Sequence, residues 1–149
     1  MRRPLLAFAV AFVVGQGLLA VFADTLAPYD PLAQDIVARL SGPSAAHWLG
    51  TDQLGRDVLS RIIHGCRASL GVSLAAVAVA LIAGGTLGLL AAYYRGWLER
   101  IVMRLMDVLL AFPALLLAIG VVAVLGPRAS SAAVAIAIVY TPIFARLLR

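Results

Sequence analysis

The sequence predicts an all-α integral membrane protein with four transmembrane helices. Of its 149 residues, 63% are hydrophobic and 13% are charged, and the mean hydropathy is +1.02, whereas about a quarter of the residues in soluble domains are charged. Charged residues are absent from four long runs, which are residues 4–23, 68–94, 108–127 and 129–145. A bilayer core takes about 20 apolar residues of helix. Uniformly apolar runs satisfy their backbone groups as helices, whereas barrel strands would alternate in polarity.

The positions of the charged residues indicate membrane topology and do not indicate binding of nucleic acid. The formal net charge is +5, and all twelve basic residues are arginines. Because these arginines flank the apolar runs, we interpret them as membrane-topology signals and expect no nucleic-acid partner. The single cysteine, Cys66, allows no internal disulfide, and the sequence has no cysteine spacing typical of a metal site.

Residues 1–23 are expected to form an N-terminal signal-anchor helix. The start Met1-Arg2-Arg3 followed by an apolar run also fits a cleavable signal peptide. Apolar regions of signal peptides are about 7–15 residues long, and this run has 20, which favours an uncleaved anchor. In either case the segment that follows is expected to lie on the external side of the membrane.

Residues 24–69 are expected to form an external loop that ends in an interfacial helix. The segment contains five Asp, four Arg and both His, with turn-forming Pro and Gly between them. From Asp57 to Cys66 the apolar positions recur at helical spacing, and Asp57 stands four residues before Arg61, as in a helical ion pair. We therefore expect a short helix at the membrane surface, leading into the second span.

The second span, about residues 70–94, carries small residues at every fourth position. They are Ala76, Ala80, Gly84, Gly88 and Ala92. Such a ridge lets another helix backbone approach closely, so we expect helix packing at Ala80, Gly84, Gly88 and Ala92. A chance stripe in an alanine-rich span is the alternative.

The rest of residues 70–149 is expected to contain a cytoplasmic loop and two further spans. Tyr93, Tyr94 and Trp97 precede or enter the Arg-rich segment 95–104, which we expect to be a cytoplasmic loop. The third span, residues 105–125, carries Pro113, which predicts a kink. Asp107 lies within helical reach of Arg104 and Arg100, so we expect it to form a structural ion pair. Near a helix N-terminus its negative charge would also interact favourably with the helix dipole. Residues 132–145 form the fourth span.

The distribution of arginines predicts that both chain ends lie inside the cell. The N-terminus, the 95–104 segment and the C-terminal residues hold seven arginines in short stretches, whereas the other two segments hold five. The positive-inside rule therefore predicts a multi-pass membrane protein with a cytoplasmic N-terminus. The family resemblance described next implies that the membrane is the bacterial cytoplasmic (inner) membrane.

The segment His47–Leu70, with the letters HWLGTDQLGRDVLSRIIHGCRASL, resembles a known family signature. It is similar to the H-x-L-G-T-D-x-x-G-R-D-x-x-S-R pattern of the C-type permease subunits of dipeptide, oligopeptide and nickel ABC importers. The matching residues are His47, Leu49, Gly50, Thr51, Asp52, Gly55, Arg56, Asp57, Ser60 and Arg61. The stretch Ala27-Pro28-Tyr29-Asp30-Pro31, the pair Met106-Asp107 with Pro113, and Leu125-Gly126-Pro127 resemble the same family.

The resemblance implies part of a type I importer permease. It implies a six-helix subunit that pairs with a second permease subunit, two cytoplasmic ATPase subunits and an external solute-binding protein. The solute is then a di- or oligopeptide, with nickel or a small peptide-like solute such as glutathione as alternatives. The chain contains no phosphate-binding glycine loop and no catalytic residue set. We therefore expect no enzyme activity and no cofactor on this chain, with Mg-ATP bound by the partner ATPases.

The resemblance also implies a cytoplasmic E-A-A-x-x-x-G coupling segment after the fourth span, and that segment and spans five and six are not found in the 149 residues. We therefore expect the four N-terminal helices of the six-helix fold, as a fragment or a truncated gene product. The rival hypothesis is a nonfunctional membrane remnant or a small autonomous membrane protein.

The signature residues allow two interpretations. Gly50-Thr51-Asp52 and Gly55-Arg56-Asp57 could form a contact surface for a partner or a device that folds the loop. Since Asp or Thr can cap a helix, Gly permits tight turns and Arg56 can pair with an Asp, the structural interpretation is favoured. A nickel site at His47, Asp52, His64 and Cys66 is disfavoured, because His64 and Cys66 lie on different faces of a helix.

Overall fold

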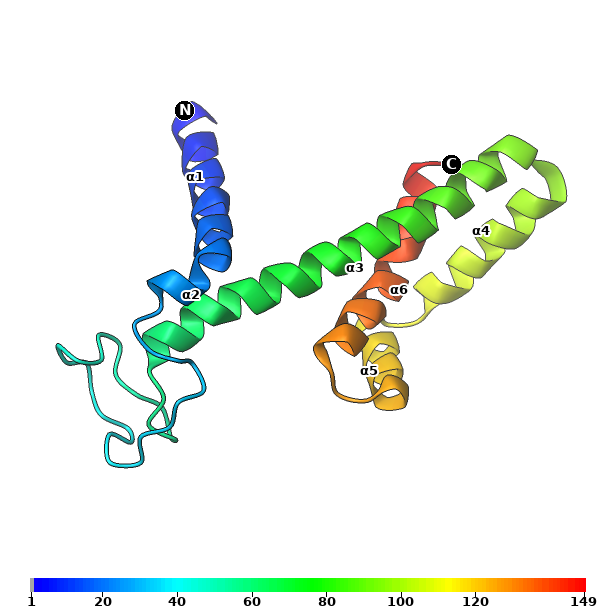
Figure 1. The fold of residues 1–149 in the computed structure, drawn as a ribbon. Helices are drawn as coiled ribbons and strands as arrows, with labels where there is room; N and C mark the ends of the chain where they lie inside the picture. The colour runs from blue at the N-terminus through cyan, green and yellow to red at the C-terminus, as the bar shows by residue number, and fades with distance from the viewer. Residues whose placement is uncertain (1) are drawn as a thin grey trace. The chain divides into compact units, whose positions relative to one another are not determined.

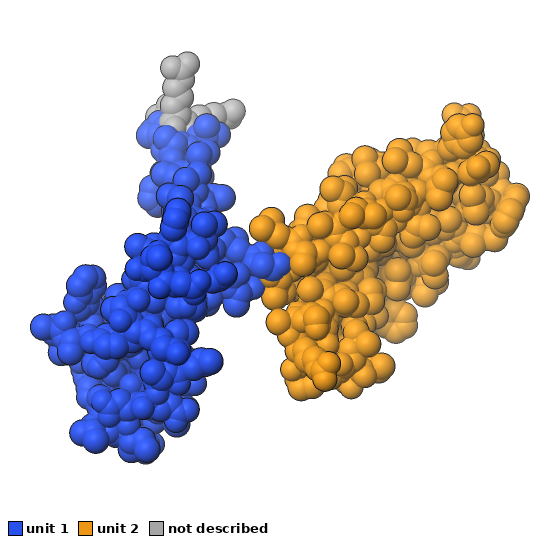
Figure 2. All heavy atoms as spheres, in the orientation of Figure 1, with its two compact units in different colours: residues 1–71 blue, residues 72–149 orange. Residues whose placement is uncertain are grey.

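The computed structural model describes residues 2–149 and is helical in all its regular elements (Figure 1). The helices are α1 (Arg2–Val21), α2 (Ala23–Leu26), α3 (Val58–Tyr94), α4 (Gly96–Ala111), α5 (Ala114–Leu125) and α6 (Ala129–Leu147). The chain divides into two compact units, one up to Gly71 and one from Val72 onward (Figure 2). The two units are described separately below.

The expected membrane spans are present as helices. Within residues 2–149, the stretch Pro4–Val21 of α1, α3 and α6 are long and apolar enough to cross a bilayer. The pair α4 and α5 passes the same test together, although the two helices are bent by 93°. The predicted all-α membrane fold is therefore confirmed, with three spans or four if the bent pair counts as one.

Helix α3 has no break between the expected interfacial helix and the expected second span. It runs for 37 residues, from Val58 to Tyr94, which corresponds to about 55 Å of helix. That length exceeds the roughly 30 Å hydrocarbon core. The segment expected to be helical at 57–66 is helical from Val58 and continues directly into the expected second span, because no Pro or other backbone break interrupts the helical pattern between Cys66 and Ser73.

Residues 96–104 are helical and do not form the expected loop. The reversal after α3 takes only Arg95 and Gly96, both with positive φ, of 49° and 65°. Helix α4 then begins at Gly96 and continues to Ala111. Charge alone suggested a loop, but Leu98, Val102 and Met106 give the segment one apolar face at helical spacing, and Met106 is fully buried.

Pro113 separates two helices instead of kinking one continuous helix. Phe112 has extended backbone angles, φ −81° and ψ 137°, and α5 starts directly after the proline. The ring of a proline disfavours helical angles in the preceding residue and removes one helix hydrogen bond. The expected kinked span at 105–125 is therefore two helices, α4 and α5.

The core of the second unit forms where α6 packs against its neighbours. Helix α6 contacts α4 and α5, and its residues Ala135, Pro142 and Ala145 are buried. Pro142 lies inside α6 without ending it. Small side chains on this helix therefore allow backbones to come close together, as expected for helices packed in lipid.

Candidate functional site

Asp52 organises a turn of the signature segment, which belongs to the first unit. One carboxylate oxygen, Oδ1, accepts hydrogen bonds from the backbone N–H groups of Leu54, at 2.8 Å, and Arg56, at 3.0 Å. The other oxygen, Oδ2, accepts from the Arg56 guanidinium and forms an ion pair with Arg61. Asp52, Arg56 and Arg61 therefore form one connected cluster.

Asp57 forms a second cluster and caps α3. Its Oδ2 accepts hydrogen bonds from the backbone N–H of Ser60, at 2.8 Å, and from the Ser60 hydroxyl, at 2.7 Å. Its Oδ1 lies 2.9 Å from Nδ1 of His47. Because Asp57 directly precedes Val58, the Ser60 contact is a helix N-cap. The expected Asp57–Arg61 ion pair is wrong, since Arg61 turns to Asp52.

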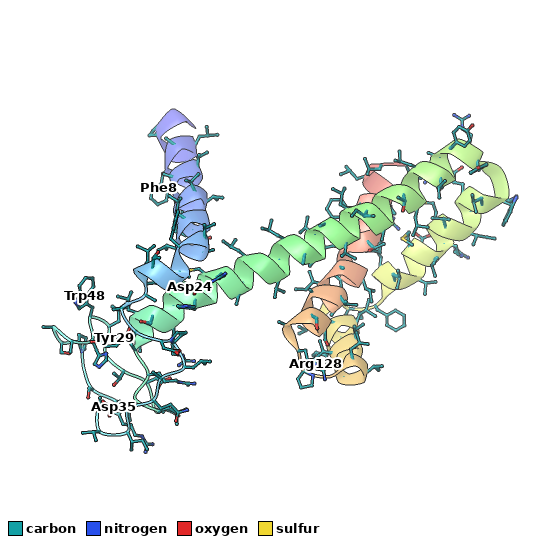
Figure 3. All side chains as sticks on the ribbon, viewed as in Figure 1. Phe8, Asp24, Tyr29, Asp35, Trp48 and Arg128 are labelled. Carbon is teal, nitrogen blue, oxygen red and sulfur yellow. The ribbon has the colours of Figure 1, made fainter. Side chains whose placement is uncertain are left out.

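Tyr29 joins this second cluster from the other end of the loop. Its backbone N–H donates to the Ser60 hydroxyl oxygen at 3.1 Å, and its phenol donates to the Ala46 carbonyl. Its ring lies 4.9 Å from the His47 ring, centroid to centroid. Figure 3 shows Tyr29 inside the loop region with Asp35 and Trp48 farther out. One sequence signal pointed to this role, an aromatic residue between two prolines shortly after α2.

Thr51 and two glycines fix the path of the loop backbone. The Thr51 hydroxyl donates to the Ala38 carbonyl and accepts from the Ser41 N–H. Gly50 and Gly55 both have φ of +74°. A Cβ atom at Gly55 would overlap the backbone of Asp35, so only glycine fits there. Leu49, by contrast, is 49% exposed.

A third ion-paired cluster ties α2 to α3 and was missed by the sequence reasoning. Asp24 contacts Arg67 at 2.8 Å and His64 at 3.3 Å, while Nδ1 of His64 lies 3.0 Å from the Ser60 carbonyl oxygen. A cavity of about 490 Å³ lies beside it, lined by residues including Asp24, Tyr29, Asp30 and His64. The signal available in the sequence was the opposite charge of Asp24 and Arg67 at the two ends of the loop.

All three clusters keep their carboxylates ionised. Hydrogen bonding and charge from Arg67 lower the pKa of Asp24. Desolvation raises the pKa of Asp52, but hydrogen bonds from Leu54 and Arg56 outweigh it and lower the pKa from 3.8 to about 2. Desolvation also raises the pKa of Asp57, but the hydrogen bonds from Ser60 and the contact with His47 outweigh it, so the pKa of Asp57 is lowered as well.

The structure of residues 2–149 provides no set of ligands for the nickel site considered above. No group of three or more His, Cys, Asp or Glu side chains converges there in a way that could hold a metal ion. His47 and Asp52 belong to different clusters, and His64 is engaged by Asp24 and Ser60. The arrangement of the signature is that of a loop held in shape by hydrogen bonds and ion pairs.

The small-residue ridge of α3 meets α6 at two glycines. A Cβ atom at Gly84 would overlap the Thr141 carbonyl oxygen, and one at Gly88 would overlap that of Ala145. Ala80 is also fully buried. Ala92 is only partly buried, and Ala91 is fully buried in its place, because a strict spacing of four drifts around a helix of 3.6 residues per turn.

Two ion pairs join α4 to the C-terminal end of the chain, one at the last turn of α6 and one just after it. Asp107 pairs with Arg146, and Glu99 pairs with Arg149. The expected pairing of Asp107 with Arg104 or Arg100 is therefore wrong, and Asp107 lies in the last half of α4, away from its N-terminus. Spacing along one helix could not reveal a partner 39 residues later.

Comparison with known proteins decides the family. Residues 84–149 match the family described as the binding-protein-dependent transport system inner membrane component. The chain is 51% identical over 132 residues to a dipeptide transport system permease protein of Alkalihalophilus pseudofirmus. The chain belongs to this permease family. It is also 49% identical over 150 residues to a glutathione transport system permease protein of Pectobacterium atrosepticum.

The permease match extends over the whole length of the chain. A probable D,D-dipeptide transport permease of Escherichia coli is 42% identical over 146 residues. The three alignments cover 89%, 100% and 98% of this chain but only 43%, 50% and 49% of the relatives. The chain therefore spans about half the length of the curated permeases that it matches, and α1–α6 are helices of the permease fold.

Proposed function

We propose that this chain forms part of the membrane path of an ATP-driven importer for di- and oligopeptides. The observation that carries the proposal is the identity of 42–51% to permeases of dipeptide, glutathione and D,D-dipeptide systems. All three names denote small peptides or a peptide-like solute. Glutathione is therefore the closest alternative, while nickel has no support from those names or from the side chains of residues 2–149.

The importer would assemble from several chains. A second permease subunit would complete the path, two cytoplasmic ATPase subunits would bind and hydrolyse Mg-ATP, and an external binding protein would deliver the solute. This chain would carry no cofactor and no catalytic residue. The positive-inside rule supports a cytoplasmic N-terminus and an external position for the loop between α2 and α3.

Uptake by whole cells tests the proposal. We would delete the codons for these 149 residues at their chromosomal locus and measure uptake of a radiolabelled dipeptide, of glutathione and of ⁶³Ni²⁺, with and without restoration of the codons. The proposal predicts a loss of dipeptide uptake that restoration reverses, with excess unlabelled oligopeptide competing. Unchanged dipeptide uptake together with lost glutathione or nickel uptake would assign the solute differently, and no loss at all would reject a transport role.

A further inference from the structure

The loop between α2 and α3 carries large apolar side chains that nothing in the described chain covers. Val37 is 96% exposed and Ile36 is 79% exposed, and Leu40 and Leu54 are exposed as well. We refer to these four residues as the apolar loop surface. Single exposed apolar side chains are common on proteins, whereas a contiguous group of them marks a contact surface.

Backbone contacts bring the two parts of the apolar loop surface together. The N–H of Leu40 donates to the carbonyl oxygen of Asp52 at 3.1 Å. A Cβ atom at Gly55, the residue after Leu54, would overlap the backbone of Asp35. The four apolar side chains therefore belong to one small region of the loop, although they lie up to 18 residues apart in the sequence.

Leu40 is held in a strained backbone conformation. Its φ is 52°, in the left-handed region that a leucine rarely adopts. Such a conformation persists only where the surrounding structure holds it. Here the hydrogen bond to Asp52 and the bond from the Thr51 hydroxyl to the Ala38 carbonyl fix the backbone on both sides. The strain leaves the Leu40 side chain 65% exposed, so we expect a contact from outside the chain to compensate for it.

An ion pair marks the external boundary of the hydrocarbon core. The charge-free run 4–23 ends just before Asp24, and the charge-free run 68–94 begins just after Arg67. The two side chains pair at 2.8 Å. Asp24 and Arg67 therefore place the end of the apolar region at the same level on both helices, on the side where the positive-inside rule supports an external loop.

The apolar loop surface lies outside that boundary. Val58 precedes Arg67 by nine residues, which is about 13.5 Å along α3, and its N–H donates to the Gly50 carbonyl oxygen at 3.1 Å. A headgroup layer is only about 5–8 Å thick. Taken along α1 instead, Figure 3 shows Asp35 beyond Asp24. By either helix the apolar loop surface faces water and not lipid.

We propose that the apolar loop surface docks the external solute-binding protein, through a patch of aliphatic or aromatic side chains on that protein. The proposal rests on the proposed function, in which such a protein delivers the solute. Asp35, Arg39 and Gln53 are exposed and lie next to the four apolar residues in the sequence. This mixture of apolar and polar residues is typical of a contact that forms and separates. A permanent contact with a second permease subunit would be larger and more uniformly apolar.

Uptake by spheroplasts tests the docking surface. Spheroplasts of cells that carry the parent chain or a variant at its chromosomal locus lose their external binding proteins. The dipeptide-binding protein is purified from the released fluid by its retention of radiolabelled dipeptide, and it is added back at increasing concentration. The initial rates of dipeptide uptake then give the concentration of binding protein at half-maximal rate and the maximal rate.

Three variants separate apolar docking from a general effect on the loop. Ile36→Ser with Val37→Ser is expected to raise the half-maximal concentration about tenfold at an unchanged maximal rate, because docking loses two apolar side chains while the membrane path stays intact. Ile36→Leu with Val37→Leu keeps the surface apolar and should retain the parent value. Trp48→Ser removes an exposed apolar side chain elsewhere on the loop (Figure 3) and should also retain it. Immunoblots establish equal amounts of each chain in the membrane.

The contrary results have separate meanings. Parent uptake that does not depend on added binding protein would reject the proposed function and the docking surface together. Dependence in the parent with an unchanged half-maximal concentration in the double Ser variant would reject the docking surface alone. A lower maximal rate at an unchanged half-maximal concentration would assign the four residues to the second permease subunit instead. An equal increase caused by Trp48→Ser would show that no particular surface is involved.

Discussion

Asp57 illustrates how one carboxylate connects distant parts of the external loop. Its side chain is 1% exposed, and it holds Ser60 at the start of α3 and His47 on the loop, while Tyr29 donates to the same Ser60 hydroxyl. The signature pattern predicted capping residues here. It could not predict which aspartate caps, because Asp52 and Asp57 both stand near the helix start and only the folded backbone assigns their partners.

Replacing Asp57 with Ala should destabilise the loop by about 2 kcal/mol, because a helix cap and hydrogen bonds to a charged group are lost together. The measurement is the rate of trypsin cleavage at Arg39 in the intact protein, which should rise about thirtyfold if cleavage follows local opening. Asp30→Ala, which removes only the turn contact to Leu32, is the control. Equal rates for both variants would contradict the assignment of Asp57 as the cap.

Acid should loosen the same loop. The pKa of Asp24, Asp52 and Asp57 is lower in the folded chain than the ordinary value of 3.8, and that of Asp52 is about 2. A lowered pKa gives stability that is complete above the unfolded value and is lost as pH falls through the folded value. Trp48 fluorescence, in a Trp97→Phe background, should therefore be constant above about pH 4.5 and change between about pH 4 and pH 2. A transition centred near pH 6 would contradict the carboxylate explanation.

The helices show which sequence patterns carry reliable information. Charge-free runs predicted α1, α3 and α6, because length and polarity decide whether a helix can span lipid. The α4 segment was misjudged because its arginines suggested a loop, and Pro113 because a proline can either bend or end a helix. The choice at Pro113 depends on whether neighbours hold the preceding residue helical, and Phe112 is extended.

Contacts between helices divide into backbone packing and exposed ion pairs, and the two should differ in strength. Gly88→Leu forces a side chain into the α6 backbone and should cost more than 2 kcal/mol, whereas Arg146→Gln removes a half-exposed pair and should cost less than about 1 kcal/mol. The midpoint of unfolding in sodium dodecyl sulfate measures both.

Two positions on α3 serve as controls for that measurement. Gly71→Leu enters open space on the same helix, and Leu89→Ala truncates a side chain that is already exposed. Both should leave the midpoint close to that of the parent chain. A loss of stability by Gly71→Leu as large as that by Gly88→Leu would contradict the packing explanation, because leucine favours a helix more than glycine does and meets no neighbour at position 71.

At the scale of the whole molecule, the arginine distribution predicts an external loop between α2 and α3 and a cytoplasmic turn between α3 and α4. In a Cys66→Ala background, a membrane-impermeant thiol reagent should label Ser44→Cys in intact cells and should reach Gly96→Cys only after the membrane is opened. The loop carrying Ser44 precedes α3, and Gly96 follows it, so one span should separate the two positions. Labelling of Gly96→Cys alone in intact cells would reverse the orientation.

The central proposal is that the chain forms part of the membrane path of a peptide importer and that the close α3–α6 contact is required for this role. Its most direct test is dipeptide uptake by cells that carry Gly84→Leu with Gly88→Leu at the chromosomal locus, compared with Gly65→Leu with Gly71→Leu on the same helix, where a Cβ atom meets nothing within 4 Å. The account predicts at least a tenfold loss of uptake for the first pair and near-normal uptake for the second, at equal amounts of chain in the membrane. Normal uptake by the Gly84 and Gly88 variant would contradict it.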